Sequence, residues 1–311
     1  MRELKVLAVV VFFSLAVYWL VEPFAHGQLH KHVDSENFEY KDLPAMTKTG
    51  DVARGQELVM GAGACVGCHS IEAAGMPAMM DPVTAAASYG VNPPDLSDSG
   101  AIYDEKFLAA LIKDPASALK VSHKFDPAAG KMHPMTQFYG AGGDIDQEIA
   151  DMVAYLKSIA TKEITPKVAY DNACGRCHSI DYMNGTQIGE RVSHKKKQDE
   201  LVFEKNLLDY QDALTKYMGK LPPDLSMYAG SRGQVFLETL IENPQNRLDG
   251  TAMPRVGLTA EATEKVITYM RDSYDPKREE RNSVGINVMI YLVFFALFAY
   301  LWKRKIWSEL H

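Results

Sequence analysis

The stretches Cys65-Val66-Gly67-Cys68-His69 and Cys174-Gly175-Arg176-Cys177-His178 organise this sequence. Each has the C-x-x-C-H spacing, in which two thiols attach covalently to the vinyl groups of a haem and the histidine binds the iron. The sequence holds four cysteines, and the two motifs contain all of them. The motifs therefore predict two covalently bound haem c groups. The attachment sites are Cys65, Cys68, Cys174 and Cys177, and the axial iron ligands on one side are His69 and His178.

A bare C-x-x-C pair also occurs in thioredoxin-type redox sites and as half of a zinc site. Here a histidine follows directly in both motifs, and a similar downstream sequence follows each of them. These two features favour haem attachment over the thiol and zinc alternatives. No cysteine is left over for a disulfide or for nucleophilic catalysis, and no catalytic residue is predicted.

The composition is typical of a folded body, since hydrophobic residues make up 47% and charged residues 23% of the 311 residues. These values argue against both a disordered chain and a multi-span transporter. The net charge is −7, from 40 acidic and 33 basic side chains. This balance argues against a nucleic-acid partner and is compatible with a positively charged protein partner.

Both ends of the chain carry apolar runs. Residues 1–22 contain a run from Val6 to Val21, which follows Arg2 and Lys5. This run is longer than most signal-peptide cores and lacks a clean A-x-A site, so it favours a retained anchor, with a cleaved signal as the alternative. Residues 284–302 form a second run, long enough to cross a membrane at about 1.5 Å per residue.

The basic cluster Lys303-Arg304-Lys305 directly follows the second run. By the positive-inside rule, this cluster predicts a cytoplasmic tail over residues 303–311. Both termini are then cytoplasmic, at a bacterial inner membrane, and the body between the runs lies in the periplasm. Covalent haem attachment takes place in that compartment, so the motifs and the topology agree.

Between the apolar runs, we expect a polar linker at residues 23–50 and two domains, at 51–162 and 163–276. A loop rich in glycine, alanine and methionine is predicted over residues 73–90. Helical patterns in the first domain cover three ranges, namely 51–63, 107–112 and 147–159.

The second domain repeats the plan of the first. Pro222-Pro223-Asp224-Leu225-Ser226 matches Pro93-Pro94-Asp95-Leu96-Ser97, and residues 236–244 match 107–115 at the same offset. A last helix over 261–272 corresponds to the one over 147–159. Internal repetition of this kind predicts two tandem domains of one mainly α-helical fold.

The predicted loop after the haem motif is longer in the second domain and contains the charged stretch 190–204. Within this stretch, His194-Lys195-Lys196-Lys197 is a candidate docking patch. A solvated loop or helix end explains the same residues, and the sequence favours that simpler interpretation.

The order of a short helix, haem motif, loops and closing helix resembles the class I cytochrome c domain. In that family a methionine between the proline-ended helix and the last helix supplies the second axial ligand. The second domain has one methionine in this window, Met253 of Ala252-Met253-Pro254. The resemblance therefore implies Met253 as the ligand there.

In the first domain the same window contains Met132, His133 and Met135. Alignment of Met135-Thr136-Gln137-Phe138 with Met253-Pro254-Arg255-Val256 favours Met135, with Met132 as the alternative. Ligation by His133 or His123 would instead give a bis-histidine haem of lower potential.

The second domain and the C-terminus resemble cytochrome c1. Pro222-Pro223-Asp224-Leu225-Ser226 followed by Arg232 is similar to its P-P-D-L-S…R signature, and residues 303–310 are similar to its K-R-x-x-W-S-x-L ending. In that family the segment shields the haem edge and the arginine lies near a haem propionate. The resemblance implies that Pro223, Arg232 and, by the repeat, Pro94 belong to the haem environment.

The extra haem domain and the N-terminal anchor depart from ordinary cytochrome c1. Dihaem forms of this kind resemble the cytochrome subunit of the cytochrome bc1 complex in epsilonproteobacteria and related bacteria. The resemblance implies an electron-transfer subunit of a respiratory chain that does not itself form the quinol-oxidising site. Its partners would be cytochrome b and a Rieske iron–sulfur protein, in a dimeric complex, with a soluble cytochrome c or a terminal oxidase as acceptor.

Two other classes of protein also contain paired haem c groups. The cytochrome subunit of a cbb3-type oxidase has two such domains and an anchor, but it lacks the P-P-D-L-S…R signature and the Trp-Ser-x-Leu tail. A dihaem peroxidase is an enzyme with one open iron and no C-terminal membrane helix. The sequence favours the bc1 interpretation over both alternatives.

Overall fold

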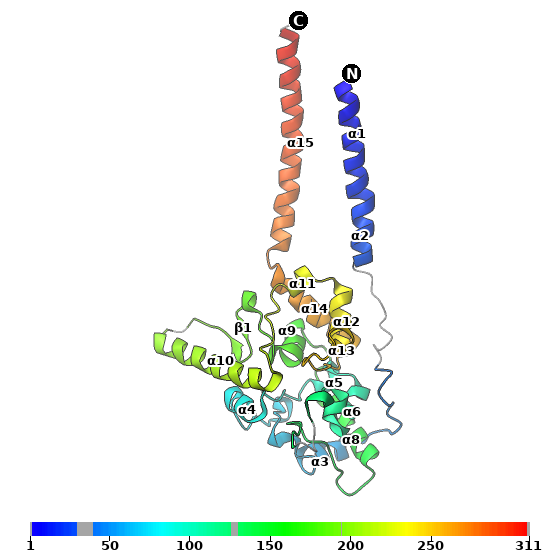
Figure 1. Ribbon diagram of the computed structural model, residues 1–311, viewed down its shortest axis with the longest axis vertical. Coiled ribbons are helices and arrows are strands. Elements are labelled where there is room, and N and C mark those ends of the chain that lie inside the picture. The colour runs from blue at the N-terminus through cyan, green and yellow to red at the C-terminus, as the bar shows by residue number, and fades with distance from the viewer. Residues whose placement is uncertain (1, 30–39, 126–129, 194, 310–311) are drawn as a thin grey trace.

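A computed structural model of the chain describes all residues except 1, 30–39, 126–129, 194 and 310–311. Two long helices leave a helical body on the same side, and the two chain ends lie at their far ends (Figure 1). The N-terminal one comprises α1 (Arg2–Ala16), a π-helical turn (Val17–Val21) and α2 (Glu22–Leu29), and the C-terminal one is α15 (Arg278–Glu309). Both are long and apolar enough to cross a membrane, at Arg2–Ala25 and Arg278–Glu309. This confirms the predicted pair of terminal membrane helices.

Helices are also the main secondary structure of the body, where loops and short turns connect them. In its first half they are α3 (Val52–Met60), α4 (Pro82–Tyr89), α5 (Ser99–Ile102), α6 (Glu105–Lys113), α7 (Pro115–Ala118) and α8 (Ile145–Ile159). Aspartates start several of them, because their carboxylates accept hydrogen bonds from free N–H groups of the first turn. Asp104 accepts at 2.8 Å from the Lys106 N–H at the start of α6, and Pro115 prevents α6 from continuing.

The second half has the same order of helices, with a short β-hairpin added and the long helix α10 (Lys197–Met218) in the place of α4. It contains α9 (Pro166–Tyr170), strands β1 (Gly185–Thr186) and β2 (Gly189–Glu190), α10, α11 (Tyr228–Ser231), α12 (Gln234–Glu242), α13 (Pro244–Arg247) and α14 (Ala260–Tyr274). The strands pair antiparallel, Gly185 with Glu190 and Thr186 with Gly189. Asn243, between α12 and α13, has φ −148° and ψ 81°, close to the φ −151° and ψ 89° of Asp114 between α6 and α7. The repeat seen in the sequence is therefore also a repeat of backbone conformation.

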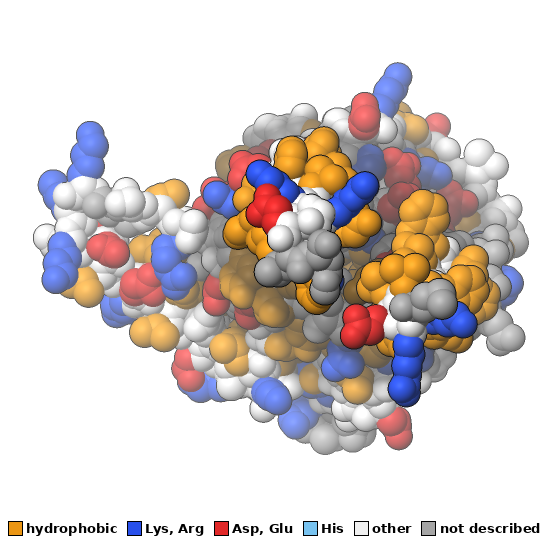
Figure 2. Space-filling model, turned by 90° about the horizontal axis from the view of Figure 1, so that it is seen from above, with side chains coloured by type: hydrophobic (Ala, Val, Ile, Leu, Met, Phe, Trp, Pro, Cys, Tyr) orange, Lys and Arg blue, Asp and Glu red, His pale blue; other side chains and the backbone are white. Residues whose placement is uncertain are grey.

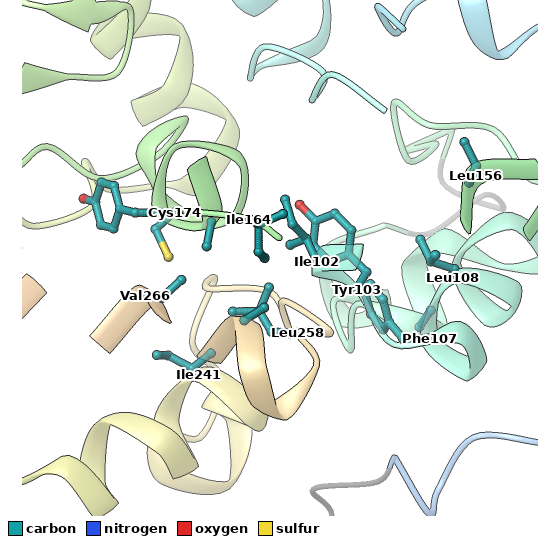
Figure 3. Close-up of a cluster of buried hydrophobic side chains, with 14 of the residues drawn as sticks. Ile102, Tyr103, Phe107, Leu108, Leu156, Ile164, Cys174, Ile241, Leu258 and Val266 are labelled. Atoms are coloured by element: carbon teal, nitrogen blue, oxygen red, sulfur yellow. The ribbon is translucent and has the colours of Figure 1, made fainter. Parts of the chain in front are cut away.

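Most of the buried apolar side chains of the two halves lie in one shared core, and Ala86, Tyr210 and Leu214 form a second, smaller cluster. In Figure 3, Tyr103 of the first half lies beside Leu258 of the second, and Phe107 and Val266 belong to the same shared core. α3 packs on α8, and α9 packs on α14. Along the long axis of the molecule, α11, α12 and α14 lie next to the membrane helices, whereas α3, α4 and α8 lie at the far end (Figure 1).

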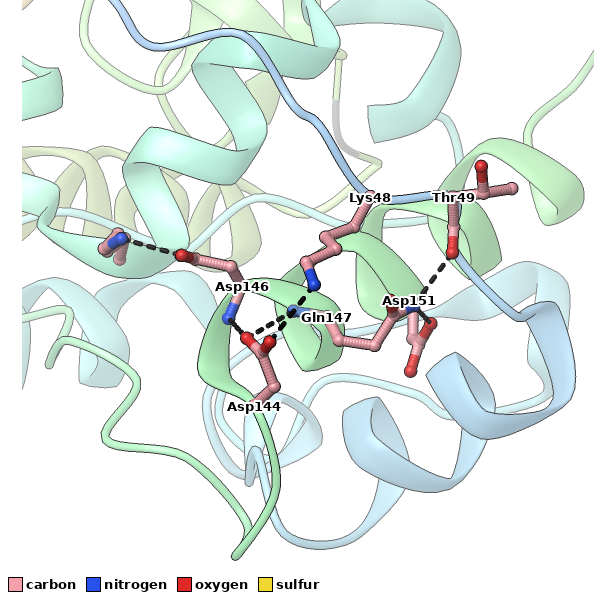
Figure 4. A network of polar contacts seen from close by, with 7 residues as sticks. Lys48, Thr49, Asp144, Asp146, Gln147 and Asp151 are labelled. Atoms are coloured by element: carbon pink, nitrogen blue, oxygen red, sulfur yellow. Dashed lines mark hydrogen bonds and ion pairs between the residues drawn. The ribbon is translucent and has the colours of Figure 1, made fainter.

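The end of the predicted linker is attached to the first half. The Asp51 N–H donates to Asp151 at 2.7 Å, and the Gln147 amide donates to the Thr49 carbonyl at 2.8 Å. Lys48 pairs with Asp144 at 3.3 Å, so a network of polar contacts joins the linker to the start of α8 (Figure 4). Residues 48–51 therefore form part of the folded body.

The structure corrects two sequence predictions. The predicted loop over 73–90 contains α4, which Asp81 caps with hydrogen bonds to the N–H groups of Val83 and Thr84. The charged stretch 190–204 runs into α10, in which Leu207, Tyr210 and Leu214 are buried at helical spacing. Lys195, Lys196 and Lys197 are exposed, as expected for a solvated helix end, and His194 lies outside the described residues.

One glycine at the junction of the two halves yields a test of this packing. Gly257 has φ +77°, and a Cβ there would lie 2.0 Å from the Phe107 ring. We expect Gly257→Ala to lower the free energy of unfolding by about 3 kcal/mol, through backbone strain and overpacking together. Gly250→Ala is the matched control, since Gly250 has φ +71° but open space around it, and should cost about 1 kcal/mol. Chemical denaturation followed by circular dichroism compares the two variants, and equal losses would contradict the junction described here.

Candidate haem sites

The two C-x-x-C-H motifs fold into the same turn. In the first, the His69 N–H donates to the Cys65 carbonyl at 2.9 Å, and in the second the His178 N–H donates to the Cys174 carbonyl at 2.9 Å. The second cysteine of each motif bonds to the same carbonyl, Cys68 at 3.2 Å and Cys177 at 3.0 Å. All four thiols are free of disulfides. Each turn thus gathers two thiols and one imidazole within five residues.

The two histidines have matching hydrogen bonds. Nδ1 of His69 lies 2.8 Å from the Pro94 carbonyl oxygen, and Nδ1 of His178 lies 2.8 Å from that of Pro223. A carbonyl can only accept a hydrogen bond, so Nδ1 carries the proton and Nε2 keeps a free lone pair. Orientation of a metal-binding histidine by a carbonyl is common at metal sites. This arrangement fits an iron ligand in both halves.

Burial favours the neutral form of both imidazoles. It lowers the pKa of His69, and the nearby positive charge of Arg176 lowers it further. Burial likewise lowers the pKa of His178. Only the neutral form of histidine can bind a metal. Two thiols, a turn and an oriented neutral imidazole therefore fit a covalently attached haem c at each motif.

The Pro-Pro-Asp-Leu-Ser segment of the first half holds the chain just after the haem motif. Asp95 accepts from the Glu72 N–H at 3.1 Å, and the Ser97 hydroxyl accepts from the Ala73 N–H at 3.0 Å. The Asp95 carboxylate also accepts from the Ser97 N–H at 2.8 Å. The segment therefore fixes both His69 and the backbone that follows it.

The same segment in the second half makes the same contacts. Asp224 accepts from the Asp181 N–H at 2.9 Å, and the Ser226 hydroxyl accepts from the Tyr182 N–H at 3.1 Å. The Asp224 carboxylate accepts from the Ser226 N–H at 3.0 Å. The repeat in the sequence thus has a physical reason, because one proline carbonyl, one carboxylate and one hydroxyl serve the same purpose in each half.

The predicted methionine ligands occupy similar turns. The Met253 N–H donates to the Thr251 hydroxyl at 3.2 Å, and the Met135 N–H donates to Nδ1 of His133 at 3.2 Å. In both cases the acceptor is the side chain two residues earlier. This matching register supports Met135 as the counterpart of Met253. Met132 has no such match, and its side chain is 58% exposed.

The other predicted residues lie as follows. Nδ1 of His133 contacts the Met135 backbone, and its Nε2 is buried without a hydrogen-bond partner among the described residues. His123 is exposed in a 3₁₀ turn (Ser122–Lys124). Arg232 is also exposed, and its guanidinium lies 5.2 Å from the centre of the Phe236 ring. The axial roles of the methionines and the role of Arg232 stay predictions.

A contact that the sequence did not predict joins the second motif to the segment that holds His69. Arg176, between the two cysteines of the second motif, donates to the Asn92 carbonyl at 3.0 Å. The Tyr210 hydroxyl of α10 accepts from the Asn92 N–H at 3.2 Å and donates to the Arg176 carbonyl at 2.8 Å. Asn92 lies two residues before Pro94, whose carbonyl bonds to His69. Short paths through hydrogen bonds and backbone therefore connect the two histidines.

Comparisons with known proteins match two parts of the chain. Residues 52–160 match the family model for cytochrome c, and residues 256–310 match that for the cytochrome C1 family. No curated protein matches the chain significantly. A solved structure titled "Hyperthermophilic respiratory Complex III" aligns at 21% identity with a TM-score of 0.39, covering 47% of this chain and 75% of the other.

The number of haem groups can be counted. Replacing Cys65 and Cys68 together by Ala should halve the haem content relative to protein, because a haem without thioether bonds is lost on denaturation. Mass spectrometry of the denatured chain and the alkaline pyridine spectrum measure this content. The matched pair is Cys174 and Cys177, whose replacement should remove the other half. An unchanged haem content in either double variant would contradict attachment at that motif.

The ligand in the first half can be tested by three single replacements. Met135→Ala should abolish the thioether signature of one haem and lower its reduction potential, since thioether ligation raises the potential. Met132→Ala should leave both haems unchanged, because its side chain lies outside the matching turn. Optical and redox titrations of these variants and of His133→Ala identify the ligand. If Met132→Ala produced the change and Met135→Ala did not, the assignment would be reversed.

Proposed function

We propose that this chain, a cytochrome c1-like protein with an added cytochrome c domain, is the electron-transferring cytochrome subunit of a bc1-type quinol–cytochrome c oxidoreductase. The cytochrome C1 match over residues 256–310 carries this proposal. This range runs from the segment before α14 through α15, and so includes the closing helix of the second half and the membrane helix. A soluble carrier has no need for such a continuous connection between a haem domain and a membrane.

Each bound haem c would supply an iron that exchanges one electron at a time. The chain's own residues hold that iron in place. The carbonyls of Pro94 and Pro223 orient His69 and His178, and the aspartate and serine of each P-P-D-L-S segment fix the adjoining backbone. A rigid ligand set needs little rearrangement when the charge on the metal changes. Quinol oxidation is assigned to the cytochrome b subunit.

The arrangement of the halves supports an order of transfer. The second half lies next to the membrane helices, and the first half lies at the far end of the body (Figure 1). We assign receipt of the electron from the Rieske protein to the second half, which contains the first part of the cytochrome C1 match. The first half then passes it to a soluble cytochrome c or a terminal oxidase. The Arg176–Asn92 contact supports transfer between the halves, because it joins the second motif to the segment whose Pro94 carbonyl bonds to His69.

The charges at the chain ends support a periplasmic body. Both membrane helices leave the body on one side (Figure 1), which supports a location of both termini on the same side of a membrane. Lys303-Arg304-Lys305 lies near the end of α15, and Arg2 and Lys5 lie at the start of α1. Basic residues at both far ends support a cytoplasmic location of both termini.

The exposed surfaces fit the proposed partners. Apart from Asn287, the side chains of α15 from Val284 to Trp302 are apolar and exposed, as for a helix that packs on lipid or on a membrane subunit such as cytochrome b. Seen from above, apolar side chains surround each of the two membrane helices (Figure 2). The net charge of −7 would attract a basic soluble acceptor. Complexes of the resembled type are dimers, and we extend this to the present chain.

Affinity purification tests the proposal. The chain with a tag after His311 is isolated from gently solubilised membranes, and the accompanying subunits are identified by mass spectrometry, with an untagged strain as control. We expect cytochrome b and a Rieske protein, together with quinol–cytochrome c reductase activity. Recovery of a haem–copper oxidase subunit in their place would overturn the proposal and favour a cbb3-type assembly.

A further inference from the structure

The segment that follows Met253 is held by parts of the chain outside its own half. The Arg255 N–H donates to the Leu119 carbonyl at 3.0 Å, and the Thr259 N–H donates to the Ile102 carbonyl at 2.9 Å. The Gly257 carbonyl accepts from the Asp104 N–H at 2.9 Å. All three partners belong to the first half. In contrast, the segment after Met135 bonds within its own half, where the Phe138 N–H donates to the Ile112 carbonyl at 2.9 Å.

A buried ion pair adds a second attachment. The Arg255 side chain is only 2% exposed and donates to both carboxylate oxygens of Asp42, at 3.2 Å for the pair of Nη1 with Oδ1. Nζ of Lys120 lies 3.4 Å from Asp42 Oδ2. Charged hydrogen bonds of this bidentate kind are strong, and removing one partner leaves a buried charge unpaired. A cation two residues after Met253 is thus held by a carboxylate of the linker.

Tyr40 makes the third attachment, also from the linker. Its side chain is 4% exposed, and its hydroxyl donates to the Leu258 carbonyl at 2.7 Å. Its ring lies 6.0 Å from that of Phe107 and 5.7 Å from the Arg255 guanidinium. Tyr40 has φ 49°, a left-handed conformation that is unfavourable for a tyrosine. The buried ring and the hydrogen bond hold the residue in this conformation.

We propose that Tyr40 and Asp42 are positioning residues that clamp the Met253 segment, so that the linker to the N-terminal anchor controls the axial ligand of the second haem. This inference rests on the proposed role of Met253 as that ligand. The clamp acts through Arg255 and Leu258, which lie on either side of Gly257. The clamp holds the Met253 segment against the first half. Its removal would therefore allow Met253 to leave a bound haem iron more often. Among the described residues of the first half, the linker bonds to Lys120, Asp144 and Gln147 rather than to the turn at Met135.

Carbon monoxide measures how often a ligand leaves, because it binds reduced haem iron only at an open axial position. The full-length chain is reduced, exposed to carbon monoxide and examined optically, and both potentials are determined by redox titration. We expect Asp42→Asn to raise the carbon monoxide-reactive population of one haem roughly tenfold, as for the loss of about one charged hydrogen bond. The potential of that haem should fall, and the other should stay unchanged.

Three further variants serve as comparisons. Asp42→Glu keeps the carboxylate and should restore most of the wild-type behaviour. Tyr40→Phe keeps the ring, removes only the hydroxyl, and should act in the same direction as Asp42→Asn, to a smaller extent. Asp212→Asn is the matched control, since it removes an exposed pair with Lys216 on α10, and it should change neither haem.

Met253→Ala separates the possible failures. If Met253→Ala opens one haem to carbon monoxide and Asp42→Asn does not, the clamp is overturned while the ligand assignment stands. If Met253→Ala opens neither haem, the assignment of Met253 is overturned, and the clamp with it. Reaction of both haems in Asp42→Asn would indicate general loosening and would also overturn the inference. A match between Asp42→Asn and Met253→Ala at one haem supports it.

Discussion

The hydrogen bond from a histidine Nδ1 to a proline carbonyl is the constraint on which this molecule depends. It occurs twice, at His69 with Pro94 and at His178 with Pro223, with the same length of 2.8 Å. The bond fixes the tautomer, the ring orientation and the free nitrogen at once. It also requires the Pro-Pro-Asp-Leu-Ser segment to lie beside the motif, about 25 to 45 residues away in the chain. The loops of each half are arranged to satisfy this single requirement.

The two halves are alike in the contacts around the motif histidines and differ in the contacts of the segments that follow Met135 and Met253. The contacts of Asp95 and Ser97 recur at Asp224 and Ser226 almost unchanged. The segment after Met253, however, lies across the first half and contributes Leu258 to the shared core (Figure 3). The duplicated plan thus ends in an asymmetric packing. Because of that packing, the two halves share one hydrophobic core and are not two independently packed domains.

The features of the molecule that depend only on residues close together in the chain could be predicted from the sequence. The haem motifs, α6, α8 and both membrane helices follow from spacing, capping and hydropathy. The short helix α4 was missed because its apolar residues are mostly alanines, whose helical period is weak, and α10 because its charged residues mask three buried ones. Contacts such as Arg176 with Asn92 or Arg255 with Asp42 join distant, individually ordinary residues. No pattern within one segment contains that information.

The linker contacts also set an order for the maturation of the chain. Tyr40 and its partner Leu258 are 218 positions apart, and Asp42 and Arg255 are 213 apart. The linker precedes both C-x-x-C-H motifs in the chain, whereas Arg255 and Leu258 follow both of them. Contacts of such long separation form late, because a large loop must close first. The turns of both C-x-x-C-H segments depend only on local hydrogen bonds, so they can form before the linker contacts close the body around them.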